Sequence, residues 1–272
     1  MLTPLPPTIL VLAGHDPSGG AGIIADCEAI TACGGWGLSV PTALTVQDCR
    51  NVYRVMPVAP AVIIETADAL ADMQIAAIKV GLVADEATLA AVETVIRRYP
   101  GIPVVMDPVQ KASGGNELST VGWVDTVVDR LLPLVDILTP NRAELARLTS
   151  HLEADAEDTA RAVELISRGC QAILVTGTDD PLPHAPADQV THTLHTPDIS
   201  RQWHWPRLEG GYHGSGCTLA SALAARLAVG ESLVQACEQA QEFTWQSLSH
   251  GYLPATGYAL PNRRFQATLT AR

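Results

Sequence analysis

A glycine-rich segment, Gly210–Thr218, leads into an alanine-rich stretch and carries the clearest chemical potential in the chain. Glycines before a helix let a ligand approach free backbone amides, which suit an anion or a transferring phosphoryl group. We therefore predict a site for an anion at this helix N-terminus. The dipole is expected to lower the pKa of Cys217, which could then accept a proton from an attacking hydroxyl. The alternative is a small residue that packs at a glycine-rich cap.

A second small-residue loop, Gly14–Gly22, separates a predicted strand from a predicted helix. It has neither the G-x-G-x-x-G fingerprint of dinucleotide sites nor the Gly-Lys-Ser/Thr end of a P-loop, so neither phosphate mechanism applies. Asp26 falls one turn into the following helix, where it could accept a hydrogen bond from a ligand. A tight turn, followed by an acidic residue that the helix dipole favours, is the alternative interpretation.

Two acidic segments follow predicted strands. Asp107 ends one strand, and Asn141 and Glu144 lie one helical turn apart after another. Phosphoryl transfer from ATP uses Mg²⁺, which binds one or two carboxylates and keeps several waters. These three residues are therefore candidates for a metal region, although each type is also common in ordinary caps and turns.

The elements that must position these residues alternate between apolar runs and helix-period segments. Predicted strands cover 8–13, 76–80, 103–106, 135–138 and 172–176, and predicted helices cover 21–32, 86–98, 119–132 and 157–168, with one more after Pro140. This alternation predicts an α/β fold with a mostly parallel sheet covered on both faces. The pattern of residues 178–188 predicts an exposed loop, and that of 190–206 predicts an antiparallel edge of the sheet. Two further helices are predicted, beginning at about 214 and 231. Ligands of such sheets bind beyond the carboxyl ends of the strands.

Composition narrows the class of protein. The chain has 272 residues, of which 47% are apolar and 17% charged, which is consistent with a single domain over 1–272. Its net charge of −12 argues against a nucleic-acid partner. No Lys or Arg precedes Arg50 and no apolar run is long enough for a bilayer, so we expect neither export nor membrane insertion. Six cysteines without a C-x-x-C pair favour reduced thiols in the cytoplasm.

In chain order, these segments resemble the bacterial hydroxymethylpyrimidine/phosphomethylpyrimidine kinase family. The matching pieces are AGHDPSGGAGIIADCEAI, SVPTALTVQD, IKVGL, VVMDPV, ILTPNRAEL, ILVTGT and YHGSGCTLASALAA. The resemblance implies a ribokinase-like three-layer αβα sandwich and a homodimer. It also implies ATP- and Mg²⁺-dependent phosphorylation of 4-amino-5-hydroxymethyl-2-methylpyrimidine, and then of its monophosphate, to make the pyrimidine part of thiamine diphosphate.

The resemblance also implies residue roles. Substrate contacts fall on Gly14, Asp26, Gln47, Leu82 and Val109. The family's anion hole and catalytic cysteine fall on Gly214, Ser215, Gly216 and Cys217, and its metal region falls on Asp107, Asn141 and Glu144. Nucleotide contacts fall on Thr176 and Gly177, with Lys111 as a further cation.

The chain departs from the family pattern in three places. Many members have Lys-Gly-Gly-His where this chain has Thr-Gly-Thr-Asp at 176–179, so a cation near the phosphates is missing. We expect Mg²⁺ and the anion hole to stabilise the phosphate charge in its place. In the segment 110–115, Gln110 stands where the family often has Met, and the lysine is at position 111 whereas the family's lysine comes a little further on. The segment 257–261 differs from the family's Gly-His-Gly tail. Pyridoxal kinase, a non-catalytic pyrimidine-binding relative and a nucleotide hydrolase are the alternative functions.

Overall fold

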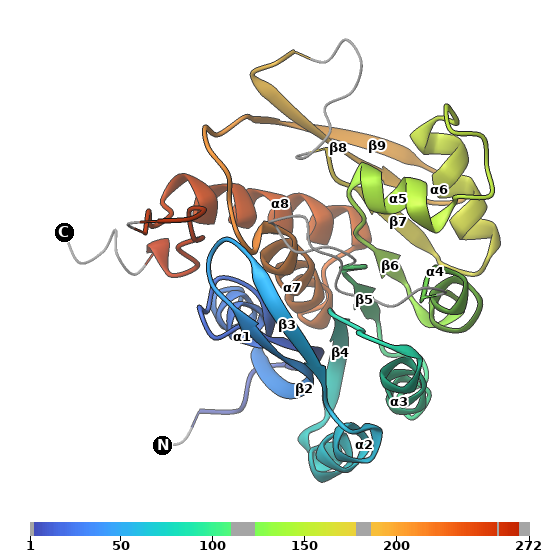
Figure 1. Ribbon diagram of the computed structural model, residues 1–272, viewed down its shortest axis with the longest axis vertical. Coiled ribbons are helices and arrows are strands. Elements are labelled where there is room, and N and C mark those ends of the chain that lie inside the picture. The colour runs from blue at the N-terminus through green and yellow to red at the C-terminus, as the bar shows by residue number, and fades with distance from the viewer. Residues whose placement is uncertain (1–2, 110–122, 178–185, 255, 267–272) are drawn as a thin grey trace.

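The computed structural model describes residues 3–109, 123–177, 186–254 and 256–266, and its described strands form one sheet (Figure 1). The sheet order is β3-β2-β1-β4-β5-β6-β7-β8-β9. The six neighbouring strands β2, β1, β4, β5, β6 and β7 run parallel to one another. At the two ends of the sheet, β3 pairs antiparallel with β2, β8 with β7, and β9 with β8. The strands are β1 (Thr8–His15), β2 (Trp36–Gln47), β3 (Val52–Pro57), β4 (Ile75–Val80), β5 (Val104–Met106), β6 (Ile137–Leu138), β7 (Ala172–Val175), β8 (Gln189–His195) and β9 (Ser200–Pro206). The mostly parallel sheet with an antiparallel edge is confirmed.

Two apolar cores lie on opposite faces of this sheet, because β1 sends alternate side chains to each. Leu10 and Leu12 belong to one core, and Ile9 and Val11 to the other. The first core is covered by α2 (Pro60–Ala69), α3 (Glu86–Ile96), α4 (Trp123–Thr126), α5 (Arg142–Leu148) and α6 (Asp158–Ser167). The second is covered by α1 (Gly22–Ala32), α7 (Ser215–Ala228) and α8 (Leu233–Ser249). The three-layer αβα arrangement expected from the sequence is therefore present.

The hairpin formed by β2 and β3 was not predicted as such, because Pro41 interrupts the apolar pattern of β2. Proline has no N–H for the ladder, and the register between β1 and β2 shifts there, since Ala13 pairs with Pro41 but Gly14 pairs with Ala43. The skipped residue, Thr42, is fully buried and donates its hydroxyl to the Leu82 carbonyl at 2.6 Å. The bulge thus ties β2 to the loop after β4.

The helix predicted over 119–132 differs from the structure. Residues 119–122 lie outside the described part of the chain, α4 ends at Thr126, and a π-helical turn (Val127–Leu131) and a 3₁₀ turn (Leu132–Leu134) follow. Pro133 explains the break, since it has no N–H to continue an α-helix. Within the described residues no helix is both long and apolar enough to cross a membrane.

Candidate active site

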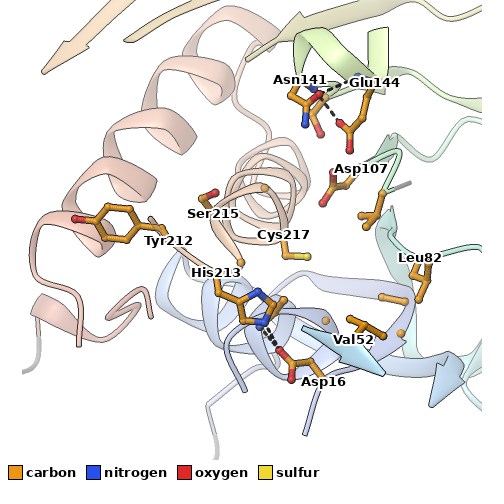
Figure 2. A pocket seen from close by; sticks show the side chains of 18 of the residues that line it. Asp16, Val52, Leu82, Asp107, Asn141, Glu144, Tyr212, His213, Ser215 and Cys217 are labelled. Carbon is orange, nitrogen blue, oxygen red and sulfur yellow. Dashed lines mark hydrogen bonds and ion pairs between the residues drawn. The ribbon is translucent and has the colours of Figure 1, made fainter. Parts of the chain in front are cut away.

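A cavity of about 540 Å³ opens at the carboxyl ends of the parallel strands, as expected for such a sheet (Figure 2). Its lining comes mainly from the ends of the strands, from α5 (Arg142–Leu148) and from the start of α7. It includes most of the predicted site residues, namely Gly14, Gln47, Leu82, Asp107, Val109, Asn141, Glu144, Thr176, Gly214, Ser215, Gly216 and Cys217. Segments that lie more than two hundred residues apart in sequence, such as those of Gly14 and Cys217, therefore meet in one place.

The anion hole predicted at the start of α7 has a helix N-terminus that only glycine permits. Gly214 is the N-cap with φ 88°, and a Cβ there would lie 1.9 Å from the carbonyl oxygen of Gly20. The α7 chain thus packs directly against the Gly14–Gly22 loop. The amides of the first turn have no partner within the helix and face the cavity, which suits an anion.

Replacement of Gly214 by alanine is expected to displace the first turn of α7 and lower the rate of the reaction at this site by about 100-fold, the usual cost of misplacing a site by 1 Å. The matched control is Gly230→Ala, because Gly230 has φ 90° but nothing within 4 Å of a Cβ. Both variants carry similar backbone strain, but only the alanine at Gly214 also collides with Gly20 and Ala21 at the cavity wall. Steady-state kinetics with thermal unfolding of both variants measures the effect, and equal activity in the two would contradict the prediction.

The prediction that the helix dipole lowers the pKa of Cys217 is wrong. Burial raises the pKa of this thiol to about 12, and the carboxylates of Asp26 and Asp107 act in the same direction. Lys79 and a hydrogen bond from the Gly22 backbone lower that pKa without reversing the shift. Cys217 is therefore a protonated thiol at neutral pH.

Alkylation of Cys217 should be slow at neutral pH, because only the thiolate reacts. The rate is expected to rise roughly tenfold per pH unit as the thiolate fraction grows. Iodoacetamide labelling between neutral and alkaline pH, followed by peptide mass mapping, measures it. A rate that levels off near neutral pH would show that the thiol ionises there.

A buried group of charges lies beside Cys217. The Lys79 ammonium nitrogen lies 2.9 Å from both carboxylate oxygens of Asp26, both side chains are fully buried, and the Ser221 hydroxyl donates to Asp26 at 2.7 Å. Burial lowers the pKa of Lys79, but Asp26, Cys217 and Asp107 together raise it by more, so the amine stays charged. Lys79 lines the cavity, whereas Asp26 does not and lies behind it. A direct contact between Asp26 and a ligand stays a prediction.

Asp107 faces Cys217 from the end of β5 (Figure 2). Burial raises the pKa of Asp107, with Asp26 adding to the effect, while Lys79 and a hydrogen bond with Cys217 oppose it. A Cβ on Gly216 would lie 3.4 Å from an Asp107 oxygen, so this carboxylate also reaches the first turn of α7. The thiol and the carboxylate thus form a hydrogen-bonded pair at the cavity wall.

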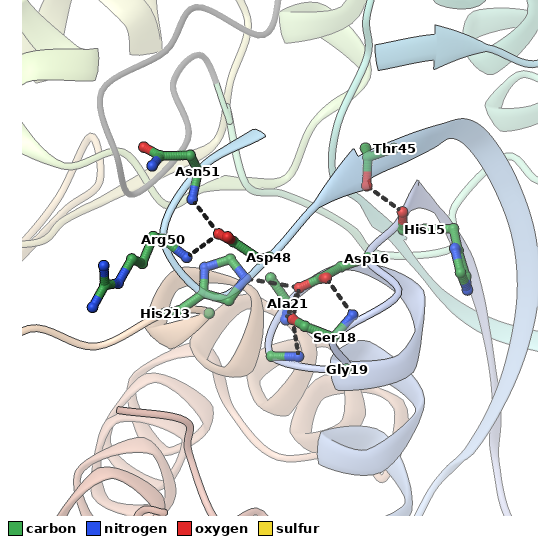
Figure 3. Close-up of polar contacts among 12 residues, drawn as sticks. His15, Asp16, Ser18, Gly19, Ala21, Thr45, Asp48, Arg50, Asn51 and His213 are labelled. Carbon is green, nitrogen blue, oxygen red and sulfur yellow. Dashed lines mark hydrogen bonds and ion pairs between the residues drawn. The ribbon is translucent and has the colours of Figure 1, made fainter. Parts of the chain in front are cut away.

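The Gly14–Gly22 loop is held in place by the Asp16 carboxylate (Figure 3). Burial raises the pKa of Asp16, but hydrogen bonds from His213, Ser18 and Ala21 lower it by more, to below its ordinary value. The His213 Nε2 atom lies 2.7 Å from Asp16 and carries the proton, because an ionised carboxylate only accepts. This bond joins the loop to the residue before the α7 cap.

Arg263 fastens the same loop from the far end of the chain. Its buried guanidinium donates to the Thr218 hydroxyl at 2.9 Å, to the Gly19 carbonyl at 3.3 Å and to the Gly20 carbonyl. It also lies 3.3 Å from the carboxylate of Glu28 on α1. The loop and the first turn of α7 are therefore bound to one another by a third segment.

Asn141 and Glu144, predicted as part of a metal region, form the capping box of α5. The Asn141 side chain accepts from the Glu144 amide at 2.8 Å, and the Asn141 amide donates to the Glu144 carboxylate at 2.9 Å. The ordinary capping role is therefore present, and both residues also line the cavity. Asp107, from the neighbouring strand, lines the same space.

The predicted nucleotide residues lie in different places. Thr176 lines the main cavity and also a second, smaller one. Gly177 lines neither, and packs so closely on β8 that a Cβ would lie 2.4 Å from the Thr191 carbonyl. Lys111 lies outside the described residues.

Comparison with known proteins decides the family. The phosphomethylpyrimidine kinase model matches residues 16–261. The chain belongs to the phosphomethylpyrimidine kinase family. It is 36% identical over 244 residues to the hydroxymethylpyrimidine/phosphomethylpyrimidine kinase of Rhizobium meliloti, covering 88% of this chain and 90% of that protein.

Two solved structures place this phosphomethylpyrimidine kinase family member among ribokinase-like folds. The phosphomethylpyrimidine kinase of Clostridium difficile has a TM-score of 0.74 and 27% identity, covering 88% of this chain and 97% of that one. The pyridoxal kinase of Staphylococcus aureus in complex with AMP-PCP and pyridoxal has a TM-score of 0.83 and 23% identity, covering 94% and 93%. The chain is thus a phosphotransferase by its family, and it has this fold.

Several residues of the kinase site were not predicted. Lys79, Asp16, His213 and Arg147 all line the main cavity. A single lysine within the apolar run 75–80 was the available signal, since a buried lysine requires opposite charges nearby. Asp16 and His213 each lie in a quoted motif, but nothing in the sequence pairs them.

Proposed function

We propose that this kinase transfers the γ-phosphoryl group of ATP to the hydroxymethyl oxygen of 4-amino-5-hydroxymethyl-2-methylpyrimidine, and then to the resulting monophosphate. The whole chain would act as one kinase domain in thiamine diphosphate biosynthesis. The observation that carries the proposal is the pairing of Cys217 with Asp107 beside the first turn of α7, in one cavity with all the predicted pyrimidine contacts except Asp26. The name of the Rhizobium meliloti relative, which includes both phosphorylations, supports it.

The proposed pyrimidine site is the part of the cavity near β1 and β2. Gln47 offers an amide that can pair with a ring nitrogen and an exocyclic amine, while Leu82 and Val109 provide apolar contacts. A Cβ on Gly14 would lie 3.0 Å from Leu82, so glycine leaves room for a flat ring against the backbone. Analogues without the amine would leave the Gln47 amide unpaired, which would exclude them.

The proposed Mg²⁺ site comprises Asp107, Asn141 and Glu144, and Asp107 would reach the ion through a water, which leaves its carboxylate able to accept a proton. No group of three or more His, Cys, Asp or Glu that could hold a metal is present among the described residues. Such a sparse set fits Mg²⁺, which binds through one or two carboxylates together with substrate phosphates and water. When bound, the ion would neutralise phosphate charge. Arg147, from the second turn of α5, lines the same cavity and would add positive charge where Thr176 replaces the family's lysine.

Proton transfer would follow from the pairing of Cys217 with Asp107. Because the Cys217 thiol is protonated at rest, it can take the proton of the substrate hydroxyl only as its own proton passes to a base. Asp107 is hydrogen-bonded to it and has a raised pKa, so its carboxylate can receive that proton. In the second reaction the nucleophile is an ionised phosphate, which needs no base.

The test is an assay of the purified protein with ATP, Mg²⁺ and hydroxymethylpyrimidine, with pyridoxal in parallel, and mass analysis of the products. Mono- and diphosphate of the pyrimidine would support the proposal. Pyridoxal phosphate alone would assign the chain to pyridoxal kinases. Pyrimidine binding without turnover would indicate a regulatory relative, and release of inorganic phosphate alone a hydrolase.

We also propose a homodimer in the cytoplasm, where the six free cysteines would stay reduced. On β2, Thr45 and Gln47 face the cavity, whereas Leu44 and Val46 point outward and are 46% and 42% exposed. They lie beside β3, an edge strand, and Tyr53 on β3 is 65% exposed. Such an apolar edge favours pairing with a second copy.

Val46→Glu is expected to shift the protein toward monomer, because it places a charge in this apolar edge. Light scattering after size exclusion measures the mass. The control is Val163→Glu on α6, where Val163 is 57% exposed and remote from the edge. A wild-type protein that elutes as a monomer would contradict the proposal.

A further inference from the structure

The hydrogen-bonded pair of Asp16 and His213 lies buried in the wall of the active site, yet no step of the proposed chemistry uses it (Figure 3). Four donors among the described residues bond the Asp16 carboxylate, which offsets the cost of burying it. Three belong to its own loop, namely the Ser18 amide and hydroxyl and the Ala21 amide, at 2.8 to 2.9 Å. The fourth, His213 Nε2, comes from a segment 197 residues later and lies at 2.7 Å. The pair therefore joins two segments that meet at the cavity.

The Gly14–Gly22 loop reaches both sides of the proposed reaction. At its start, a Cβ on Gly14 would lie 3.0 Å from Leu82, in the proposed pyrimidine site. At its end, the Gly22 amide donates a hydrogen bond to the Cys217 sulfur. The position of this loop relative to α7 therefore determines how the acceptor is aligned with Cys217.

The same loop packs without spare room on the two residues before the first turn of α7. A Cβ on Gly20 would lie 2.4 Å from the Cδ2 atom of the His213 ring, and a Cβ on Gly214 would lie 1.9 Å from the Gly20 carbonyl oxygen. The His213 amide donates to the Ala259 carbonyl at 2.9 Å, so its backbone is held independently of the ring. While the bond between His213 and Asp16 is made, the loop and the anion hole cannot shift past one another.

We propose that His213 is a positioning residue, and that its hydrogen bond to Asp16 sets the alignment between the acceptor side of the cavity and the anion hole. It acts through the loop and not on the reacting atoms. Alignment of two bound reactants changes the energy of the transition state more than it changes the binding of either one. This inference rests on the proposed function in that it requires two reactants in one cavity.

The test is steady-state kinetics of the full-length protein with His213→Leu, which removes the bond and keeps a side chain of similar size. We expect kcat to fall by about 10- to 100-fold, while KM for ATP and for the acceptor stays within about threefold. His213→Gln, whose amide nitrogen can donate to Asp16, should recover most of the rate. A raised KM with unchanged kcat would overturn the proposal, and so would an equal loss of kcat in His213→Leu and His213→Gln.

The matched control is His151→Leu, because His151 Nε2 also lies 3.1 Å from a carboxylate, that of Glu164, but at the surface. Its kcat should equal that of wild type. Asp16→Asn removes the charged acceptor from the other side of the bond, and it gives the same measurement if His213→Leu folds poorly. When the two substitutions are combined, kcat should fall by less than the product of the single effects, since both remove one bond. A fully multiplicative loss would contradict the shared bond.

A second measurement needs no turnover. Release of the loop should weaken the bond from Gly22 to Cys217, so iodoacetamide should label Cys217 faster in His213→Leu, by about tenfold or more at one alkaline pH. His151→Leu should be labelled at the wild-type rate. A wild-type labelling rate in His213→Leu would overturn the proposal. If the wild-type protein phosphorylates no pyrimidine, the proposed function fails, and the labelling rate still decides the role of His213.

Discussion

Replacement of Cys217 by alanine is expected to lower the rate of the first phosphorylation by about 10²- to 10⁴-fold, the usual contribution of a positioned proton acceptor. The second phosphorylation should lose much less, because its nucleophile is already ionised. The anion hole formed by backbone amides remains in the variant, so binding of ATP should change little. Turnover with hydroxymethylpyrimidine and with its monophosphate, each at saturating ATP, measures the two effects separately.

The control for this experiment is Cys49→Ala. Cys49 is a partly exposed free thiol in the β2–β3 turn and does not line the main cavity. It should leave both rates unchanged. Equal losses in the two reactions of Cys217→Ala would show that the residue shapes the anion hole and does not accept the proton.

Replacement of Lys79 by methionine should destabilise the protein by about 3–5 kcal/mol, the usual cost of breaking a buried ion pair from one side. The Asp26 carboxylate would stay fully buried with only the Ser221 hydroxyl to bond it, and Asp107 would lose a favourable charge. Urea unfolding followed by circular dichroism measures the change. Catalysis should fall as well, because Lys79 lowers the pKa of Cys217.

Adding Asp26→Asn to Lys79→Met should restore part of the lost stability, because it removes the unpaired charge and keeps a hydrogen-bonding group beside Ser221. The surface control is Arg168→Gln, which removes an ion pair with Glu164 where the arginine side chain is 46% exposed. Its effect should stay below about 1 kcal/mol. A similar loss of unfolding free energy in Arg168→Gln and Lys79→Met would show that burial of the ion pair does not determine its contribution to stability.

The sequence was most informative where local spacing sets local structure. The glycines before α7 predicted a helix N-terminus open to ligands, and Gly214 has the positive φ that such a cap requires. Strand and helix alternation predicted the parallel sheet and the place of the cavity. The Asn141–Glu144 spacing permitted both a capping box and a cavity position, and the structure contains both.

Contacts between distant segments could not be predicted. Burial is the main cause of the raised pKa of Cys217, with Asp26 and Asp107 adding to it and Lys79 opposing it, and the local motif indicates none of these. The β2–β3 hairpin was not predicted because Pro41 interrupts the apolar pattern of β2, and the sequence does not show the bulge at Thr42 that follows it. The family resemblance predicted that Asp26 contacts a ligand. In the structure its carboxylate accepts a hydrogen bond from Lys79, which lies 53 residues later in the chain.

The hydrogen bonds of Arg263 to the Gly14–Gly22 loop affect the order in which this enzyme can fold during synthesis. The Gly19 and Gly20 carbonyls accept hydrogen bonds from Arg263, which is synthesised 244 and 243 residues after them. At ordinary translation speeds, that interval lasts roughly 10 to 50 s. A nascent chain on the ribosome can therefore build its first strands and helices early, yet its glycine loop gains this restraint only when the last segments emerge.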